Sequence, residues 1–373
     1  MIKIAINATF VDHNIRSGLQ VYLESLLKGL AAIDESNEYS LLFTSLRRRE
    51  SQMPGPDKKN FHKKVLRYPD IKFPYKDFIL NKVYLPYYLK RNLCNIYHAP
   101  AGYYLPDSNT VKKILTIHDL RSLKIQDKTF PQDIVSLKKA SRKADVCITV
   151  SECTKKDVID LLEVKENKIK VTYLAVDEAF HPIDKKENES IKAKYNLGEK
   201  FIFALGQVPR KNVKRLIGAF SKFKHKKEFL LVIGGAGENG LWVSEYRELI
   251  KKLNLETEVR LIGYIPYNDL PLLYNACEFF IFPSLYEGFG IPILEAMRCG
   301  VPVITSNVSS LPEIGQDAVL YVDPYSEEDI ARQMEKLTED KELKRALVAK
   351  GASRANEFSW ERMAQETLKI YKE

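Results

Sequence analysis

Two carboxylates eight positions apart, Glu287 and Glu295, bracket a short run that contains two glycines and a proline. Gly288 and Gly290 permit a tight loop and a close approach of a ligand to the backbone. Pro292 stands where a first helical turn begins, a position at which its missing N–H does no harm. An apolar strand precedes the loop, so the helix N–H groups and the positive end of the helix dipole are expected to point at one place. The pattern predicts an anion site, most naturally for a phosphate, and the flanking carboxylates indicate a nucleotide attached to a sugar.

A second candidate group follows another apolar strand, at residues 201–205. Gly206 ends that strand, and Arg210 and Lys211 then open a helix. Two cations beside a helix N-terminus would converge on a diphosphate. The alternative is a solvated basic turn, but the Glu287 loop in the same half of the chain favours the diphosphate. Gly263, Tyr264 and Ile265 follow a third strand and are expected to line the nucleobase.

Candidate residues of the first half also lie at strand ends. His118, in Thr-Ile-His-Asp, is expected to bind a sugar hydroxyl or act as a base, with a capping role as the alternative. Ser17 and Gly18 precede the first long helix, where they would cap it or form a loop over the donor phosphate or the acceptor. His98 ends a strand too, and here a structural role is favoured.

Two other chemistries are not favoured. The run Gly235-AGEN-Gly240 matches a dinucleotide-binding pattern, but it follows the second strand of its half and no acidic residue ends the next strand. No Asp-x-Asp pair and no His/Asp cluster with metal spacing occurs, so no protein-held metal and no required cofactor are expected. Arg210 and Lys211 would instead neutralise a leaving diphosphate.

Strands and helices must alternate along the chain to position these loops. Short apolar runs recur between stretches with helical spacing, which predicts an α/β protein with parallel sheets covered by helices on both faces. We expect two Rossmann-like domains that face each other across a cleft, with ligands at the carboxyl ends of the strands. The expected boundaries are 1–180 for the acceptor domain, 181–198 for a polar linker and 199–359 for the donor domain. A C-terminal helix at about 360–373 is expected to return to the first domain.

The composition indicates the cellular environment of the protein. The chain has 373 residues, of which 45% are hydrophobic and 29% charged, and its five cysteines are scattered. These features favour a reducing cytoplasm, and no run of about 18 apolar residues predicts a spanning helix. The net charge is +9, and residues 47–91 alone hold 13 Lys/Arg against 4 Asp/Glu. That basic, aromatic segment suits contact with an anionic membrane at its inner face or with an acidic acceptor, although a solvated basic face over core aromatics is an equal alternative.

These motifs together resemble those of glycosyltransferase family 4, the retaining GT-B enzymes, over nearly the whole chain. The match rests on Glu287-GFGIPIL-Glu295, on Pro-Arg-Lys-Asn at 209–212, on His-Asp-Leu at 118–120 and on the segment ADVCITVSECTKKDV. His-Asp-Leu together with Pro-Arg-Lys-Asn is most similar to bacterial mannosyltransferases of polysaccharide and O-antigen assembly. The resemblance implies a hexosyltransferase that uses a nucleoside diphosphate sugar and a saccharide or lipid-linked acceptor.

The resemblance also implies roles for single residues. Glu295 would bind the nucleotide ribose, and Glu287 would face the donor sugar, assisted by backbone N–H groups of the loop. Lys211, with Arg210, would hold the diphosphate, His118 would touch the donor sugar, and Gly18 would lie near the phosphate. The loop residues expected to assist are Gly288, Phe289, Gly290 and Ile291.

One position departs from the family pattern. Gln207 stands where many members carry arginine, which leaves the cationic role to Arg210, Lys211 and Arg215 without deciding among them. Glucosyl or galactosyl transfer from a UDP-sugar remains the alternative activity. A nucleotide-sugar epimerase is a less favoured alternative. A binding module is also less favoured, because nucleic-acid or simple ligand binding would leave Glu287 and Lys211 without a purpose.

Overall fold

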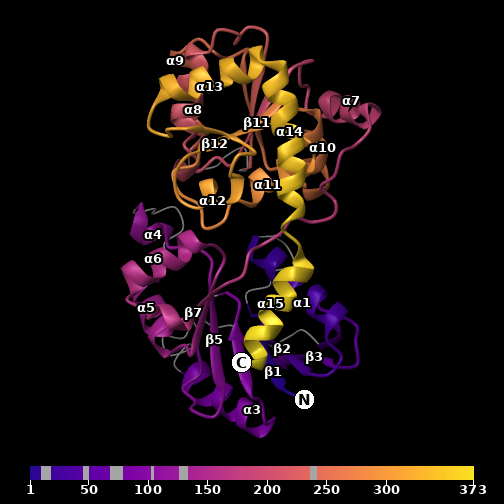
Figure 1. Ribbon diagram of the computed structural model, residues 1–373, viewed down its shortest axis with the longest axis vertical. Helices are drawn as coiled ribbons and strands as arrows, with labels where there is room; N and C mark the ends of the chain where they lie inside the picture. Colours follow the sequence, from indigo (N-terminus) through magenta and orange to yellow (C-terminus); the bar gives the residue numbers. More distant parts are fainter. Residues whose placement is uncertain (10–17, 45–49, 68–78, 102–104, 126–132, 236–241) are drawn as a thin grey trace. The chain divides into compact units, whose positions relative to one another are not determined.

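The structure is a computed structural model, and it describes residues 1–9, 18–44, 50–67, 79–101, 105–125, 133–235 and 242–373. The chain divides into two compact units. The first comprises Met1–Leu123, Gln132–Leu174 and Ser359–Glu373, and the second comprises Lys124–Pro131 and Ala175–Phe358. The C-terminal helix is therefore part of the first unit, although it follows the second along the chain (Figure 1).

The first part of the chain alternates between strands and helices. Its elements are β1 (Lys3–Asn7), α1 (Gly18–Ile33), β2 (Glu38–Thr44), η1 (Glu50–Gln52), β3 (Phe61–Leu66), η2 (Leu80–Tyr84), α3 (Leu85–Arg91), β4 (Ile96–Ala99), β5 (Lys112–Ile117), α4 (Arg121–Lys124), α5 (Ile134–Lys143), β6 (Val146–Thr149), α6 (Glu152–Leu162), η3 (Glu166–Lys168) and β7 (Ile169–Val171). The strands form one parallel sheet in the order β3-β2-β1-β4-β5-β6-β7.

Helix α15 (Trp360–Lys372) packs beside α1 in the first unit. The two helices approach closely at Gly29, where an added Cβ would lie 2.7 Å from the Cβ of Ala364. Lys112 also donates from Nζ to the Ile370 carbonyl at 2.8 Å, which ties the last turn of α15 to β5. The end of the chain is thus built into the core of the first unit.

The second unit repeats the alternation. Its elements are α7 (Lys185–Lys194), β8 (Phe201–Leu205), η4 (Pro209–Lys211), α8 (Val213–Lys222), β9 (Leu230–Gly234), α9 (Val243–Lys252), β10 (Val259–Gly263), η5 (Tyr267–Asp269), α10 (Leu270–Ala276), β11 (Phe279–Phe282), α11 (Ile291–Arg298), β12 (Val303–Ser306), α12 (Leu311–Gly315), β13 (Leu320–Val322), α13 (Glu327–Glu339) and α14 (Lys341–Asn356). The strands form a parallel sheet in the order β10-β9-β8-β11-β12-β13.

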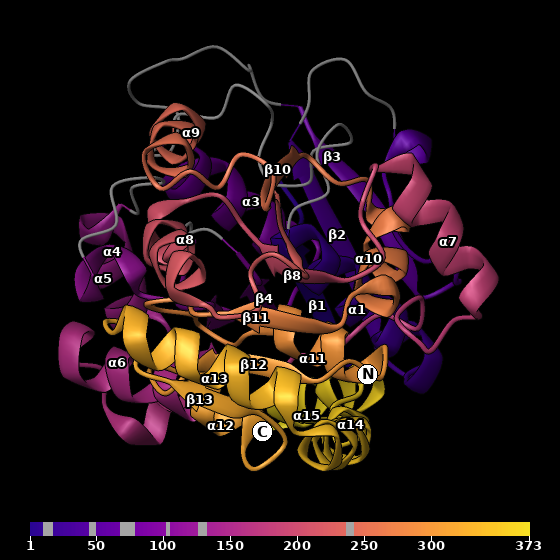
Figure 2. The same cartoon turned by 90° about the horizontal axis from the view of Figure 1, so that it is seen from above.

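Helices cover both faces of this second sheet. Helix α8 packs with α9 and α13 on one face, and α10, α11 and α14 cover the other (Figure 2). Burial on both faces explains why the strands are continuous apolar runs, such as Phe-Ile-Phe-Ala-Leu in β8. The strand order reverses between β8 and β11, and the carboxyl ends of strands at such a switch point form the usual ligand crevice of open α/β sheets.

The expectation of an α/β protein with two parallel-sheet, Rossmann-like units is confirmed. The structure differs from it in two local respects. Residues 61–66 form the edge strand β3, although no strand was expected there. The polar segment 181–198, expected to be a linker, contains helix α7, which packs on α10 and buries Ile191.

Candidate functional site

The loops after β8 and β11 meet in the second unit. The two strands are neighbours in the sheet, so their carboxyl-end loops lie side by side. The backbone N–H of Leu285 donates to the Arg210 carbonyl at 2.8 Å, and the Ser284 hydroxyl oxygen lies 3.1 Å from the same carbonyl oxygen. The switch point of the sheet therefore brings together the two motifs that the sequence places more than 70 positions apart.

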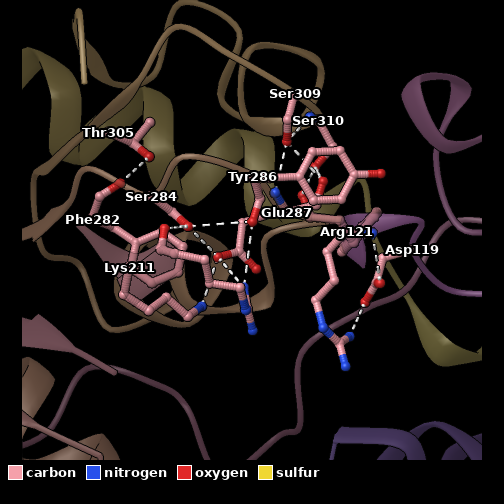
Figure 3. Close-up of polar contacts among 12 residues, drawn as sticks. Asp119, Arg121, Lys211, Phe282, Ser284, Tyr286, Glu287, Thr305, Ser309 and Ser310 are labelled. Carbon is pink, nitrogen blue, oxygen red and sulfur yellow. Dashed lines mark hydrogen bonds and ion pairs between the residues drawn. The ribbon is translucent and has the colours of Figure 1, made fainter. Parts of the chain in front are cut away.

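Glu287 is the centre of this group (Figure 3). Its Oε1 accepts hydrogen bonds from Arg210 Nη1 at 2.8 Å, Lys211 Nζ at 2.7 Å and Ser284 Oγ at 2.5 Å. Burial alone would raise the pKa of this carboxyl, but the charges of Arg210 and Lys211 outweigh burial and lower it to about 2. The carboxylate is therefore ionised at any physiological pH and neutralises part of the two cations.

Lys211 is held in a fixed position along its whole length. Its stem lies against Gly206, where an added Cβ would come within 2.6 Å of Lys211 Cγ and where φ is +100°. Its ammonium group lies 4.2 Å from the centre of the Phe282 ring, a cation–π contact. Burial lowers the pKa of Lys211 to about 8, although Glu287 acts to raise it. Gly206 thus serves the expected site by making room for the lysine.

Arg215, the third candidate cation, is held elsewhere. Its Nη1 donates to Asn212 Oδ1 at 3.0 Å, and its guanidinium lies over the Tyr325 ring at 5.2 Å. Gln207 is 2% exposed, and its amide donates to the Ile233 carbonyl at 2.8 Å. The structure therefore joins Arg210 and Lys211 to Glu287, and the amide of Gln207 is bound to β9 instead.

Two serines that the sequence analysis did not single out fix the backbone of the Glu287 loop. Ser309 Oγ accepts from the Glu287 N–H at 2.8 Å and donates to the Glu287 carbonyl at 2.7 Å. Ser310 Oγ donates to the Phe289 carbonyl at 2.7 Å. Both serines stand directly before α12, a position where serine is common. This position is the sequence feature that could have drawn attention to them.

The glycine loop leads into α11 as expected. Gly290 precedes the helix with a φ of +111°, in the left-handed region that favours glycine, and Pro292 lies in the first turn. Phe289 is buried and its ring packs edge-on against Phe358. Gly288 and Ile291, the remaining loop residues, are partly exposed. The loop is therefore anchored by Phe289 with its glycines on either side.

Glu295 lies on α11 in a different environment from Glu287. It is 9% exposed, and Tyr274 donates to its Oε2 at 3.0 Å. Burial raises the pKa of Glu295 to about 7, even though the Tyr274 hydrogen bond and the charge of Lys211 act to lower it. Two carboxylates of one motif thus differ in charge near neutral pH.

This difference predicts a pH dependence of donor binding. If ionised Glu295 accepts the ribose hydroxyls, nucleotide-sugar affinity should rise as the pH rises through 7, by roughly eightfold between pH 6 and 7.5. Nucleotide sugars are the right probe because their diphosphate does not titrate in this range. Titration calorimetry of the wild type against Glu295→Gln measures the effect, and an equal slope in both proteins would contradict it.

The three residues expected near the nucleobase differ in their exposure to solvent. Gly263 has a φ of +65° and its carbonyl accepts from the Gly235 N–H at 2.7 Å. Ile265 is buried, with its Cδ1 2.2 Å from where a Cβ on Gly234 would stand, whereas Tyr264 is 68% exposed. Only Tyr264 of the three presents a side chain to solvent. Residues 236–240 of the glycine run lie outside the described residues.

His118 directly follows β5 in the first unit. Its Nε2 lies 2.8 Å from the Pro100 carbonyl, and since a carbonyl only accepts, Nε2 carries the proton and Nδ1 is left as an acceptor. Burial lowers the pKa of His118, which keeps the ring neutral. Asp119, its neighbour, accepts from Arg121 at 2.7 Å. Gly18 is the first residue of α1, and Ser17 lies outside the described residues.

His98 lies in the core of the first unit. It is fully buried, and both of its ring nitrogens lie within hydrogen-bond distance of side-chain hydroxyls, Tyr371 at 2.6 Å and Thr116 at 2.8 Å. Over the described residues, no group of His, Cys, Asp or Glu is arranged to hold a metal ion, and no helix is both long and apolar enough to cross a membrane.

Comparisons with known proteins agree with this geometry. Residues 185–354 match the model of glycosyl transferases group 1, and residues 16–180 match that of Glycosyltransferase Family 4. The O-antigen chain mannosyltransferase B of Escherichia coli is 34% identical over 74% of this chain and 74% of its own length. The serotype-specific mannosyltransferase WbdA of Escherichia coli is 32% identical over 67% of this chain, which spans only 32% of that longer protein.

A solved structure matches the whole chain. The HepE protein of Anabaena, in complex with UDP and glucose, has a TM-score of 0.77 and 17% identity and covers 100% of both chains. The fold is that of the GT-B glycosyltransferases, and the protein is an enzyme of this transferase class. The chain belongs to glycosyltransferase family 4.

Proposed function

We propose that this enzyme transfers a hexose, with mannose favoured, from a nucleoside diphosphate sugar to a saccharide or lipid-linked saccharide in cell-envelope polysaccharide synthesis. The observation that carries the donor assignment is the convergence of Arg210 and Lys211 on Glu287 Oε1, where the loops after β8 and β11 meet. Two fixed cations there suit a diphosphate. The mannosyltransferase relatives support the sugar and the pathway.

The chemistry follows from the charges of the site. As the anomeric C–O bond breaks, negative charge develops on the diphosphate and oxocarbenium-like charge on the sugar. Arg210 and Lys211 stabilise the departing diphosphate, and Glu287 orients the sugar and offsets its positive charge. His118 contacts the donor sugar through Nδ1. The acceptor hydroxyl attacks from the leaving-group face and gives its proton to the diphosphate, so that the anomeric configuration is retained. No metal ion is required in this scheme, because the two side-chain cations carry the charge.

The experiment is a transfer assay with radiolabelled GDP-mannose, UDP-glucose and UDP-galactose on lipid-linked and soluble saccharide acceptors, each with and without EDTA. Thermal shifts with GDP, UDP and ADP run in parallel, since ligand binding at a hundredfold over Kd adds about 2.7 kcal/mol. We expect a shift with one nucleotide and EDTA-resistant transfer from its sugar. Absence of any nucleotide shift would refute the donor site, and preference for a UDP-sugar would replace mannose by glucose or galactose.

Contact with an anionic membrane is a further part of the proposal. Val83, Tyr84 and Tyr87 on η2 and α3 are 57%, 39% and 62% exposed, which is unusual for large apolar side chains. Lys82, Lys90 and Arg91 stand among them. Apolar side chains interleaved with cations are typical of a helix that lies in the surface of an anionic membrane. The rest of the segment 47–91 includes residues 47–49 and 68–78, which lie outside the described residues.

We expect the protein to co-sediment with vesicles that contain phosphatidylglycerol at low salt and to be released at about 0.5 M NaCl, because each Lys or Arg near an anionic surface contributes about 1 kcal/mol. The double variant Val83→Ser/Tyr87→Ser should bind less. Val135→Ser is the matched control, since Val135 is 79% exposed but lies on α5. Equal binding of both variants, or no binding of the wild type at low salt, would refute the contact.

A further inference from the structure

A chain of buried polar side chains crosses the first unit from its C-terminal helix to the neighbourhood of His118. Tyr371 of α15 lies 2.6 Å from His98 Nδ1 on β4, and His98 Nε2 lies 2.8 Å from Thr116 Oγ1 on β5. The same Thr116 oxygen lies 3.3 Å from the hydroxyl of Tyr22 on α1. All four side chains are at most 2% exposed. Four elements are thus joined by one continuous polar path inside an apolar core.

The hydrogen bonds on either side of His98 must run in the same direction, from donor to acceptor. Burial lowers the pKa of His98 to about 3, so the ring is neutral and carries a single N–H. If Tyr371 donates to Nδ1, then Nε2 donates to Thr116; if Thr116 donates to Nε2, then Nδ1 donates to Tyr371. In both cases His98 relays the order from one hydroxyl to the other. Loss of one link would leave a buried polar group without its partner, which is unfavourable inside an apolar core.

The path ends on the ring that supports His118. The Tyr22 ring packs edge-on against the His118 imidazole, with centroids 4.7 Å apart and planes at 82°. The other support of His118 is the Pro100 carbonyl, two positions beyond His98 at the end of β4. Thr116 itself is two positions before His118 on β5. The Pro100 support is therefore tied to His98 along the chain, and the Tyr22 support is tied to His98 through two hydrogen bonds that share Thr116.

We propose that Thr116, His98 and Tyr371 are positioning residues that fix the His118 ring, with Nε2–H on the Pro100 carbonyl and Nδ1 kept as the acceptor for substrate. The proposal rests on the proposed role of His118 at the donor sugar. Under the proposal, the last residues of the chain contribute to catalysis without touching substrate.

The test is a double-mutant cycle on full-length protein. Thr116→Val removes the hydroxyl at constant shape, Thr116→Ser keeps it, and Tyr371→Phe removes the far end of the path. We expect Thr116→Val and Tyr371→Phe to lower kcat by about 10- to 100-fold, as small misplacements of a reacting group do. Thr116→Ser should stay within about threefold of wild type, and nucleotide affinity should be unchanged in all three. In a His118→Asn background, Thr116→Val should change kcat by less than about twofold.

A second readout does not depend on activity. The imidazole ¹⁵N resonances of His118 should report a single Nε2–H tautomer in the wild type and in Thr116→Ser, and a mixture in Thr116→Val and Tyr371→Phe. Unchanged His118 resonances, or losses of kcat that add in the double variant, would overturn the proposal, and thermal unfolding shows whether each variant is folded. If His118→Asn alone leaves transfer intact, the proposed role of His118 and this inference fall together, whereas the donor site in the second unit is unaffected.

Discussion

Replacing Glu287 with glutamine should strongly reduce sugar transfer and, at the same time, tighten the binding of nucleoside diphosphate. In the structure both Arg210 and Lys211 are engaged by one ionised carboxylate. A diphosphate that enters must share these cations with Glu287. Glutamine keeps the size of the side chain and can still accept from the Ser284 hydroxyl, but it removes the competing negative charge.

The expected magnitudes differ for the two effects. Two charges about 4 Å apart near a protein surface interact by about 4 kcal/mol, and since the diphosphate recovers only part of that, we expect Kd for the nucleoside diphosphate to fall by about tenfold. Transfer should fall by about 10²–10³, as for loss of one electrostatic contact to the transition state. Calorimetry and single-turnover transfer measure the two effects separately.

The matched control is Glu245→Gln. Glu245 is also paired with a lysine, Lys214 at 2.5 Å, but both side chains are largely exposed, so neither nucleotide affinity nor transfer should change. Transfer near the wild-type rate in folded Glu287→Gln would show that this carboxylate has no catalytic part. Weaker nucleotide binding would show instead that Glu287 organises the cations rather than competing for them.

The sequence predicted that the loops after two strands come together, because parallel strands order their loops. Strands of the β8 and β11 type lie side by side at a switch point, so apolar runs followed by Gly206 and by the Glu287 loop could be expected to meet. The choice between Arg215 and the other two cations was not decidable in this way. It depends on Asn212, whose φ of +63° turns the chain and whose side chain then holds Arg215.

The different charge states of the two glutamates also lay beyond the sequence. Glu287 is ionised because two cations from another loop reach it, and Glu295 is protonated up to about pH 7 because burial outweighs the hydrogen bond from Tyr274. Both environments consist of residues distant along the chain. A motif states that two carboxylates are present, whereas tertiary packing sets the pKa of each.

Strand β3 and helix α7 were not predicted, for reasons that lie in their own sequences. Strand β3 lies at the sheet edge and carries His62, Lys63 and Lys64, and lysines on edge strands guard against unwanted pairing while they hide the apolar alternation. Helix α7 has a polar sequence in which Ile191 is the apolar residue that packs into the unit. Neither pattern differs from that of a solvated loop until its neighbours are known.

Lys211→Met should lower kcat for transfer by about 10²–10³ while the fold is kept. Methionine has an unbranched stem that can lie on Gly206 and against the Phe282 ring as the lysine does, but it carries no charge. Lys211→Arg should not restore the rate, because the guanidinium is a planar fork and the space beside Gly206 fits a narrow stem. Lys214→Met, at an exposed lysine of the same unit, is the control and should retain full activity.

The pH profile separates a role of the Lys211 charge from a role of its shape. With a pKa lowered by burial to about 8, Lys211 loses its proton as the pH rises above 8, so kcat/KM for the donor should fall there in the wild type. Glu295 requires the opposite change near pH 7, and the two together give a bell-shaped profile. Lys211→Met should lose the alkaline limb and keep the acidic one. If the alkaline limb persisted in Lys211→Met, it would have to arise from the titration of another group. Arg210 could not be that group, because a guanidinium does not titrate in that range.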